Sequence, residues 1–269
     1  MRNSGTLFFS LVLSVMILFV SCNGFEQVKR NSDINYKLAM ADKYYAKKDY
    51  LKARELYEGL MPVMKGTKNF EGMFYKYCMS LYNLKDYLSA SYYFKNFTSS
   101  FPASKDADEA SFLHAYCLYK LSPKATVEQT NTMKAMEALQ TFQNTHPDNA
   151  HQEEVSKYIS ALRDKLEIKE ANAAKLYFDI GKYLAATVAY KIIINDFPES
   201  KSMDEYQYMI VKSHYYFAKG STQAKQEERF VNVLNAYQEL VDTYPKSKYL
   251  QDAEKYFTLA SNNLKKLKK

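Results

Sequence analysis

The sequence predicts an all-α protein built from repeated helix pairs, and three observations support this. The 269 residues include only 7 Gly and 6 Pro, the two residues that cost most in a helix interior. Four short segments, each a ring residue followed by proline, recur along the chain. Between them, small and large residues recur at fixed offsets. Repetition on this scale predicts a stack of similar units.

The first element is a processing segment. Met1-Arg2-Asn3 carries positive charge, and residues 7–20 are almost entirely apolar. This run is shorter than the roughly 20 residues that span a membrane, and it fits the apolar region of a secretory signal. Ser21 and Cys22 follow directly. An ordinary secretory signal followed by an incidental cysteine is the alternative interpretation.

The segment Phe19-Val20-Ser21-Cys22 resembles the lipobox of bacterial lipoproteins, with Phe19 where that family usually has Leu. The resemblance implies that residues 1–21 are a signal peptide that is removed and that Cys22 carries a covalent lipid. No other cofactor is expected. Residues 22–32 then read as a polar, lipid-anchored tether. Asn23, where inner-membrane lipoproteins prefer Asp, favours the outer membrane.

The four proline turns share one design. A ring residue ends one helix on the core, proline stops it because its ring cannot continue the hydrogen-bond ladder, and Ser or Asn two positions later is expected to cap the next helix. The four segments are Phe101-Pro102-Ala103-Ser104-Lys105, His146-Pro147-Asp148-Asn149, Phe197-Pro198-Glu199-Ser200-Lys201 and Tyr244-Pro245-Lys246-Ser247-Lys248.

Small and large residues repeat between these turns at offsets 0, 3, 12 and 16. Small residues let two antiparallel helices approach, and rings fill the space to the next pair. The three regular sets are Ala41, Tyr44, Ala53 and Tyr57; Cys78, Leu81, Ala90 and Phe94; and Ala174, Tyr177, Ala186 and Tyr190. The pattern resembles the tetratricopeptide repeat, in which a proline eight positions after the last ring closes the unit, as Pro102 and Pro198 do.

Two further units are stretched by polar insertions near residues 122–131 and 220–228, which are expected to be surface loops. Their matching positions are Ala115, Leu118, Ala135, Leu139 and Pro147 in one, and Val211, His214, Val233, Tyr237 and Pro245 in the other. A last helix, near residues 249–267, would cap the stack. The prediction is therefore about five helix pairs plus a C-terminal capping helix, with N-terminal repeats over residues 33–150 and C-terminal repeats over 151–269. The alternative is a generic helical bundle.

Helical geometry locates a candidate binding groove. Offsets −3, +1 and +4 from the small residue of each first helix face away from its partner helix, and in stacked pairs that side lines a concave surface. In the first three units these positions are Leu38, Asp42, Tyr45, Tyr75, Met79, Tyr82, Phe112, Tyr116 and Tyr119. We expect this groove to hold an extended, aromatic-ending peptide. The alternative is that some of these rings are core, covered by neighbouring repeats.

Several function classes lack the residues they need. The net charge of +7 comes without a basic stripe interleaved with aromatics, so nucleic acid is not an expected partner. None of the four His lies in a nucleophile elbow, and no Gly-rich phosphate loop or metal-ligand spacing occurs. Cys78 and Cys117 lie in helical pattern and are expected to be buried thiols. We therefore expect no catalytic residues and no metal site.

A lipobox followed by such repeats and turns resembles the BamD family, the lipoproteins of the outer-membrane β-barrel assembly machinery. Two local likenesses strengthen it: the opening Tyr44-Tyr45-Ala46-Lys47-Lys48-Asp49-Tyr50-Leu51-Lys52-Ala53, and a long charged helix with Leu162-Arg163-Asp164-Lys165-Leu166, Glu170, Ala174 and Tyr177.

The resemblance implies a non-catalytic scaffold, anchored to the outer membrane and facing the periplasm. Its C-terminal half would contact the barrel-forming subunit, and its N-terminal half would receive unfolded outer-membrane proteins or sibling lipoproteins. The alternative function is a periplasmic repeat adaptor for cell-wall synthesis or division. Such adaptors often carry a coiled coil before their repeats, and the short distance from Cys22 to the first repeat favours the assembly subunit.

Overall fold

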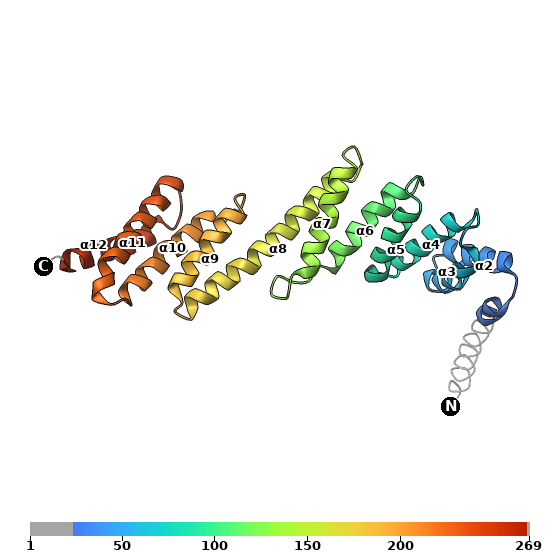
Figure 1. Cartoon of the computed structure of the whole chain (residues 1–269), viewed down its shortest axis with the longest axis horizontal. Coiled ribbons are helices and arrows are strands. Elements are labelled where there is room, and N and C mark those ends of the chain that lie inside the picture. The colour runs from blue at the N-terminus through green and yellow to red at the C-terminus, as the bar shows by residue number, and fades with distance from the viewer. Residues whose placement is uncertain (1–23, 268–269) are drawn as a thin grey trace, which may run out of the picture. The chain divides into compact units, whose positions relative to one another are not determined.

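Every regular element in residues 24–267, the part of the chain that the structure describes, is a helix. The computed structural model arranges these helices as successive antiparallel neighbours (Figure 1). The first six labelled helices are α2 (Ile34–Ala46), α3 (Tyr50–Met64), α4 (Phe70–Asn83), α5 (Tyr87–Ser100), α6 (Ala107–Leu121) and α7 (Thr130–Thr145). The others are α8 (Gln152–Asp179), α9 (Tyr183–Asp196), α10 (Met203–Lys219), α11 (Gln223–Thr243) and α12 (Leu250–Leu267). The all-α prediction is confirmed.

Residue contacts divide the chain into two compact units. Unit 1 extends to Ser122 and includes Thr130–Ser156, whereas unit 2 contains Pro123–Gln129 and continues from Lys157. The division falls inside the single helix α8, while the sequence analysis placed it between residues 150 and 151, before that helix. Helix α8 therefore contributes residues to both units.

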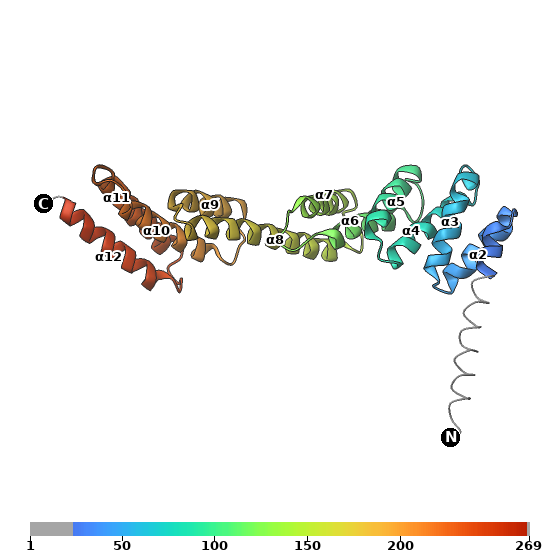
Figure 2. The same ribbon diagram turned by 90° about the horizontal axis from the view of Figure 1, so that it is seen from below.

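Each unit is held together by packing between consecutive helices. In unit 1, α2 packs on α3, and each following helix packs on the next as far as α7. In unit 2, α9, α10, α11 and α12 pack in the same serial way, and α10 also touches α12 (Figure 2). Serial contact between neighbours is the signature of a repeat array, so the structure supports repeated pairs over a generic bundle.

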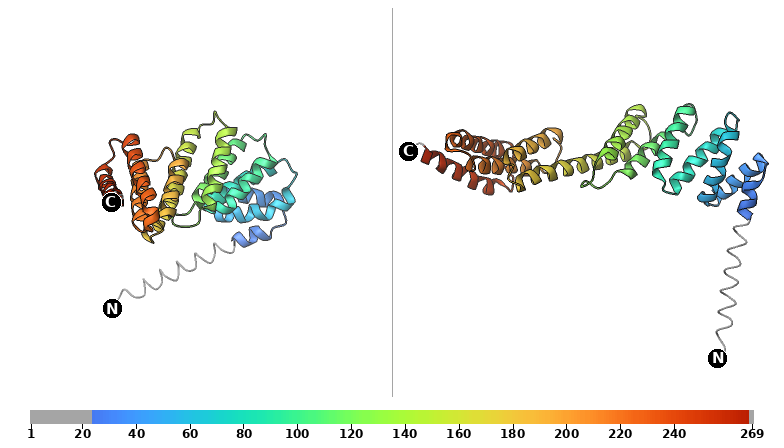
Figure 3. Two further views of the ribbon diagram at one scale, coloured as in Figure 1. Left: turned by 60° about the vertical axis from the view of Figure 1, so that its left-hand side comes forward. Right: turned by 60° about the horizontal axis from the view of Figure 1, so that its bottom comes forward.

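The small residue at offset 0 and its counterpart in the second helix are fully buried in all five units. The ten side chains with zero exposure are Ala41, Ala53, Cys78, Ala90, Ala115, Ala135, Ala174, Ala186, Val211 and Val233. The two helices of a pair lie side by side in the views of Figure 3. The large positions are less uniform, because Tyr177 is 43% exposed although its offset predicted a packed ring.

The turn inside three of the pairs has the same backbone geometry. Lys48, Lys85 and Gly181 each adopt a left-handed conformation, with φ of 61°, 60° and 77°. The amide of the next residue in each case reaches back to a helix carbonyl five positions earlier, as when Asp86 donates to Leu81 over 3.1 Å. This is the Schellman arrangement that ends many helices.

The four proline turns are also alike, with one correction to their expected chemistry. In each, the Ser or Asn side chain accepts from the amide two residues later, as Ser104 does from Asp106 over 3.2 Å. Ser200, Ser247 and Asn149 make the same bond. The helices begin after this small turn. These side chains therefore stabilise the turn that precedes the helix and do not serve as its N-cap.

One of the two expected insertions is a loop and the other is not. Residues 122–129 form no helix, as predicted. Residues 220–222 form a short turn, and the rest of the second insertion is the first part of the 21-residue helix α11. The segment from Gln223 to Arg229 is rich in Gln, Glu, Lys and Ala, which favour helix on propensity alone. The polar composition identified the exposed surface but not the helix.

The expected tether is also corrected where the structure describes it. Residues 24–30 form a short helix that packs on the first pair. Val28 is 4% exposed, the rings of Phe25 and Tyr44 meet edge to face at 5.6 Å, and Lys29 forms an ion pair with Glu55. This segment therefore belongs to the folded unit. The predicted signal peptide and Cys22 lie outside the described residues. Among the described residues, no helix is long and apolar enough to cross a bilayer.

Candidate peptide-binding and partner-binding surfaces

The predicted groove begins at a polar hollow between α2 and α4. It has a volume of about 370 Å³ and is lined by Leu38, Asp42, Lys68, Asn69, Gly72, Met73 and Lys76. One Asp42 carboxylate oxygen accepts from the Tyr57 hydroxyl over 2.7 Å and from Lys76 Nζ over 2.8 Å. Asp42 is thus a structural partner of a buried tyrosine, and it also forms part of the wall of the hollow.

A second group of predicted residues forms a continuous ring surface across α4 and α6. The half-buried rings of Tyr82, Tyr116 and Tyr119 follow one another at centroid distances of 6.1 Å. Lys120 Nζ lies 5.9 Å from the Tyr116 ring and 5.9 Å from that of Tyr87. Burial raises the pKa of Tyr82 to about 12, so its hydroxyl stays neutral and can donate. We call Tyr82, Tyr116, Tyr119 and Lys120 the ring surface.

The remaining predicted tyrosines of α2 and α4 contribute to both surface and core. Tyr45 packs edge to face on Tyr57 at 6.4 Å, and Tyr75 packs on Phe97 at 5.4 Å. Both tyrosines and Met79 are half-buried. Burial raises the pKa of Tyr45 and of Tyr75. The open groove and the covered core, which the sequence left as alternatives, therefore both apply to these residues.

Phe112 is not a groove residue. It is 5% exposed, because the His151 ring lies flat on it with centroids 3.7 Å apart and planes 2° from parallel. Phe142 packs against it at 5.7 Å. The offset rule considers only one helix pair. It could not take account of His151, which lies in the turn before α8 and covers Phe112.

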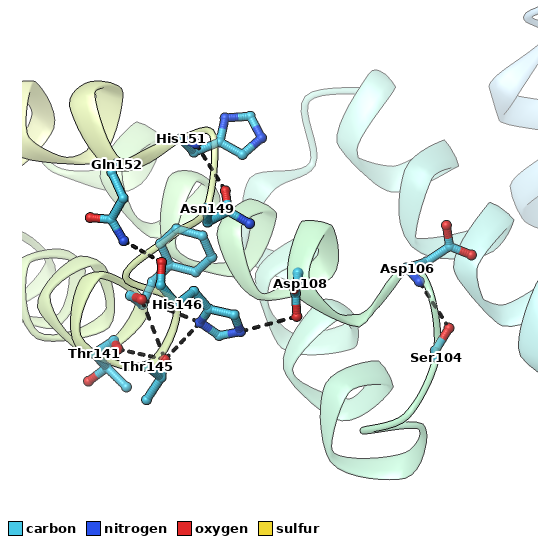
Figure 4. A network of polar contacts seen from close by, with 10 residues as sticks. Ser104, Asp106, Asp108, Thr141, Thr145, His146, Asn149, His151 and Gln152 are labelled. Carbon is cyan, nitrogen blue, oxygen red and sulfur yellow. Dashed lines mark hydrogen bonds and ion pairs between the residues drawn. The ribbon is translucent and has the colours of Figure 1, made fainter.

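Polar contacts hold that turn in place. His146 Nε2 lies 3.4 Å from an Asp108 carboxylate oxygen, and Gln152 donates to the His146 carbonyl over 2.5 Å. His151 Nε2 lies 3.0 Å from a Glu109 carboxylate oxygen. Figure 4 shows His146 directed at Asp108, with Asn149 bonded to the His151 backbone. The network fixes the start of α8 against α6 and explains why Phe112 is covered.

The sequence analysis missed an apolar surface in unit 2. Four large apolar side chains from the end of α8 and from α9 are 43–51% exposed: Tyr177, Leu184, Val188 and Ile192. They border a hollow of about 740 Å³ that Phe217 of α10 also lines. A signal was present in the sequence, since residues 183–194 contain a single charged residue, Lys191, and a helix without a polar face is expected to be covered on all sides.

One serine and histidine pair resembles part of a catalytic dyad, but its geometry argues against that role. Ser91 Oγ lies 3.0 Å from His114 Nδ1, and the same nitrogen lies 2.9 Å from the Ser91 carbonyl oxygen. A carbonyl can only accept, so Nδ1 carries the proton and cannot take one from the serine. Ser91 is also 4% exposed. Burial lowers the pKa of His114, as expected for a packed neutral ring.

The thiols in the described part of the chain are structural. Cys78 and Cys117 are buried and free, as the sequence predicted. Burial raises the pKa of Cys78, and it raises the pKa of Cys117 to about 12, which keeps both thiols protonated. Among residues 24–267, no three His, Cys, Asp or Glu side chains lie close enough to hold a metal ion.

Comparisons with known proteins identify relatives of this chain and structures similar to it. The chain is 26% identical over 171 residues to a protein of Aquifex aeolicus (strain VF5) named "Putative outer membrane protein assembly factor BamD", and the match covers 63% of this chain and 56% of that protein. Among solved structures, it is similar to the yeast Sti1 TPR2AB-domain:pHSP90-complex, with a TM-score of 0.39 and 14% identity over 85% of this chain and 98% of that one. The human IFIT1 dimer with PPP-AAAA gives a TM-score of 0.30 and 16% identity over 84% and 57%.

The likeness to the solved structures is distant and has no bearing on function. The family model is more informative, because it covers nearly all of the described residues. The YfiO model, described as outer membrane lipoprotein, matches residues 32–228 and 193–267. The chain therefore belongs to the YfiO family of outer membrane lipoproteins.

Proposed function

We propose that this protein is a lipid-anchored, non-catalytic subunit of the machinery that assembles β-barrel proteins in the outer membrane. Three observations support the proposal: the family is one of outer membrane lipoproteins, a relative bears the name of an assembly factor, and the described part of unit 1 presents the half-buried rings of the ring surface. The chain spans just over half the length of that relative.

We propose that unit 1 receives segments of unfolded barrel proteins, and the ring surface is the observation that carries this. Tyr82, Tyr116 and Tyr119 offer adjoining ring faces and edges, on which aromatic side chains of an extended chain can pack. Lys120 supplies a cation beside the rings, where a ligand carboxylate could be bound. The hollow beside Asp42 is a second candidate surface, on the first pair.

A peptide-binding experiment tests this role. A fluorescent peptide from an unfolded barrel protein, with an aromatic C-terminal residue, would be titrated with the wild type and with Tyr82→Ala and Tyr119→Ala variants. We expect each variant to bind up to about tenfold more weakly, since an aromatic pair contributes about 0.5–1.5 kcal/mol and about 1.4 kcal/mol is a factor of ten in affinity. Helical circular dichroism would verify the fold.

Tyr92→Ala is the matched control, because Tyr92 is 62% exposed on α5 and lies outside the ring surface. Equal affinity of the wild type and both ring variants, with the fold intact, would remove the ring surface from the proposal. Weakening by Tyr92→Ala to the same degree would mean that binding is unspecific.

The scaffold role is tested by purification of the full chain with a C-terminal tag in mild detergent. We expect a large outer-membrane barrel protein with periplasmic repeat domains to be recovered with it. Recovery of cell-wall synthesis or division proteins without that barrel would favour the alternative function instead.

The membrane anchor is a separate part of the proposal. Lipid on Cys22 would hold the protein at the outer membrane, because each buried methylene contributes about 0.8 kcal/mol and several acyl chains act together. Cys22→Ser should move the protein from the membrane to the soluble fraction of the periplasm. Retention of this variant in the outer-membrane fraction, with partner binding also lost, would show that the lipid is not the anchor.

A further inference from the structure

Helix α9 is apolar on both its inner and its outer face. Its inner face, with Ala186, Tyr190 and Ile193, is 0–3% exposed. Its outer face carries Leu184, Val188 and Ile192, which are 49–51% exposed. An isolated exposed leucine is ordinary, whereas a run of this kind marks an interaction surface.

The outer face has the relief of a helix-packing surface. Leu184, Val188 and Ile192 are spaced four residues apart and form one ridge along the helix axis. The small residues Ala185 and Ala189 line the hollow beside that ridge and leave room for an incoming ridge. The same combination of small and large residues packs the inner face of α9 in the core of unit 2.

The charges around this hollow are mainly positive. Lys182 lines it, and the Arg229 guanidinium sits 4.1 Å from the centroid of the Phe217 ring in its wall. Lys191 does not line the hollow, but it lies seven residues after Leu184 and therefore on the same side of α9. Within the described part of unit 2, none of these three cations has a carboxylate within 4 Å. The acidic group of Asp179, close in sequence to Lys182, is already paired with Lys175. Asp196, at the C-terminal end of α9, is the acidic exception.

We propose that this surface, which we call the α9 face, docks an amphipathic helix of another protein subunit, with apolar residues at helical spacing and acidic residues along its flanks. A helix supplies a ridge that fits the hollow, and its Asp or Glu side chains would meet Lys182, Lys191 and Arg229. The inference rests on the proposed scaffold role and assigns it a surface and a partner chemistry.

Two other occupants fit less well. A second copy of this chain would form a two-fold interface in which the same patch meets itself, so its three cations would face like charges. A bilayer takes up protruding apolar side chains, whereas the centre of this surface is a hollow of about 740 Å³.

Site-specific photo-crosslinking in the full-length, membrane-anchored protein tests the proposal. Leu184 would be replaced with p-benzoyl-phenylalanine, and the cross-linked peptide would be identified by mass spectrometry after irradiation of cells. We expect one dominant partner peptide, helical in pattern and with Asp or Glu flanking its apolar face. Lys182→Glu together with Lys191→Glu should lower the cross-linking yield at least threefold, because it reverses two of the three rim charges.

Leu88 offers a matched control position. It lies two residues before the small residue Ala90, as Leu184 lies before Ala186, and it is 70% exposed. The probe at Leu88 should not yield the same peptide. Cross-links from Leu184 to another copy of this chain, to lipid alone or to no partner would each overturn the proposal, as would an unchanged yield after the charge reversal.

The experiments distinguish failure of the α9 face from failure of the proposed scaffold role. Recovery of the barrel-assembly partner in the purification without a Leu184 cross-link would reject the α9 face alone. A Leu184 cross-link to an acidic amphipathic helix in a wall-synthesis protein would keep the α9 face and reject the barrel-assembly role.

Discussion

Tyr57 of α3 donates its hydroxyl to Asp42 of α2 over 2.7 Å. The Tyr57 side chain is fully buried, so this hydroxyl has no access to bulk water. Lys76 of α4 donates to the same carboxylate oxygen over 2.8 Å, which brings three helices to one acceptor. The residue that the sequence assigned to a ligand groove is therefore also a contact that holds the first repeats together.

Asp42→Ala should lower the free energy of unfolding by about 1–3 kcal/mol, because it leaves the buried Tyr57 hydroxyl without an acceptor. The double variant Asp42→Ala with Tyr57→Phe should be more stable than Asp42→Ala alone, since no buried hydroxyl is then left unpaired. Urea denaturation of the mature wild type, Asp42→Ala, Tyr57→Phe and the double variant measures each loss. Lys76→Ala is the control and should cost under about 1 kcal/mol, because its ion pair is partly exposed. Additive losses in the double variant would contradict this account.

Lys85→Gly should stabilise the protein by about 0.5–1 kcal/mol. Lys85 has φ of 60°, a left-handed conformation that strains residues with a Cβ and suits glycine. Its side chain is exposed, so little packing is lost. The rise would appear as a higher urea midpoint with an unchanged slope.

The other pairs provide the controls for that prediction. Lys48, with φ of 61°, occupies the equivalent turn of the first pair and should respond to Lys48→Gly in the same direction. Gly181, with φ of 77°, is the natural glycine of this series, and Gly181→Lys should reverse the effect. Stabilisation by Gly181→Lys would refute the strain argument.

The sequence predicted what depends on local pattern. The ten fully buried small residues, the proline turns and the number of pairs follow from periodicity, because each repeat makes the same contacts with its neighbours. The sequence could not predict that Phe112 is covered, since the His151 ring reaches it from a turn 39 residues later in the chain. It also assigned residues 24–30 to a tether, because their composition is polar and only Val28 is deeply buried.

The candidate sites were predicted less completely than the fold. Offsets from a small residue identify the outward side of a helix, and they placed Tyr82, Tyr116 and Tyr119 correctly on one face. They do not say which outward side chains another element covers. The α9 face was missed because the repeat offsets concern only the inner positions of its helix, such as Ala186 and Tyr190. They carry no information on whether the outer side of the helix is polar.

Cys78 and Cys117 should react slowly with a thiol reagent in the native protein. Both are buried and free, and burial raises the pKa of each thiol, which suppresses the reactive thiolate. In a Cys22→Ser background at pH 8, we expect both to react at least about a hundredfold faster in denaturant than in buffer, since reaction requires opening of the fold. Fast labelling of the native chain, with circular dichroism unchanged, would show that the first repeats open locally.

Stability should fall as the pH drops below neutrality, partly because of His214. Burial and the nearby Lys191 charge lower the pKa of His214 to about 4, whereas the unfolded chain titrates near about 6.5. The unfolded state therefore binds more protons between these values. The contribution of His214 is complete above about pH 6.5 and is lost as the pH falls toward about 4, at most roughly 3 kcal/mol over that range.

Denaturation of the wild type and of His214→Asn at pH 7, 6 and 5 measures this contribution. His114, whose pKa burial also lowers, is retained in both proteins, and so are the carboxylates, so their effects cancel in the difference. The unfolding free energy of the wild type should decline more steeply between pH 7 and 5 than that of the variant, whatever the variant costs at pH 7. Parallel pH profiles would mean that His214 is hydrated in the folded protein and that its pKa there is close to that in the unfolded chain.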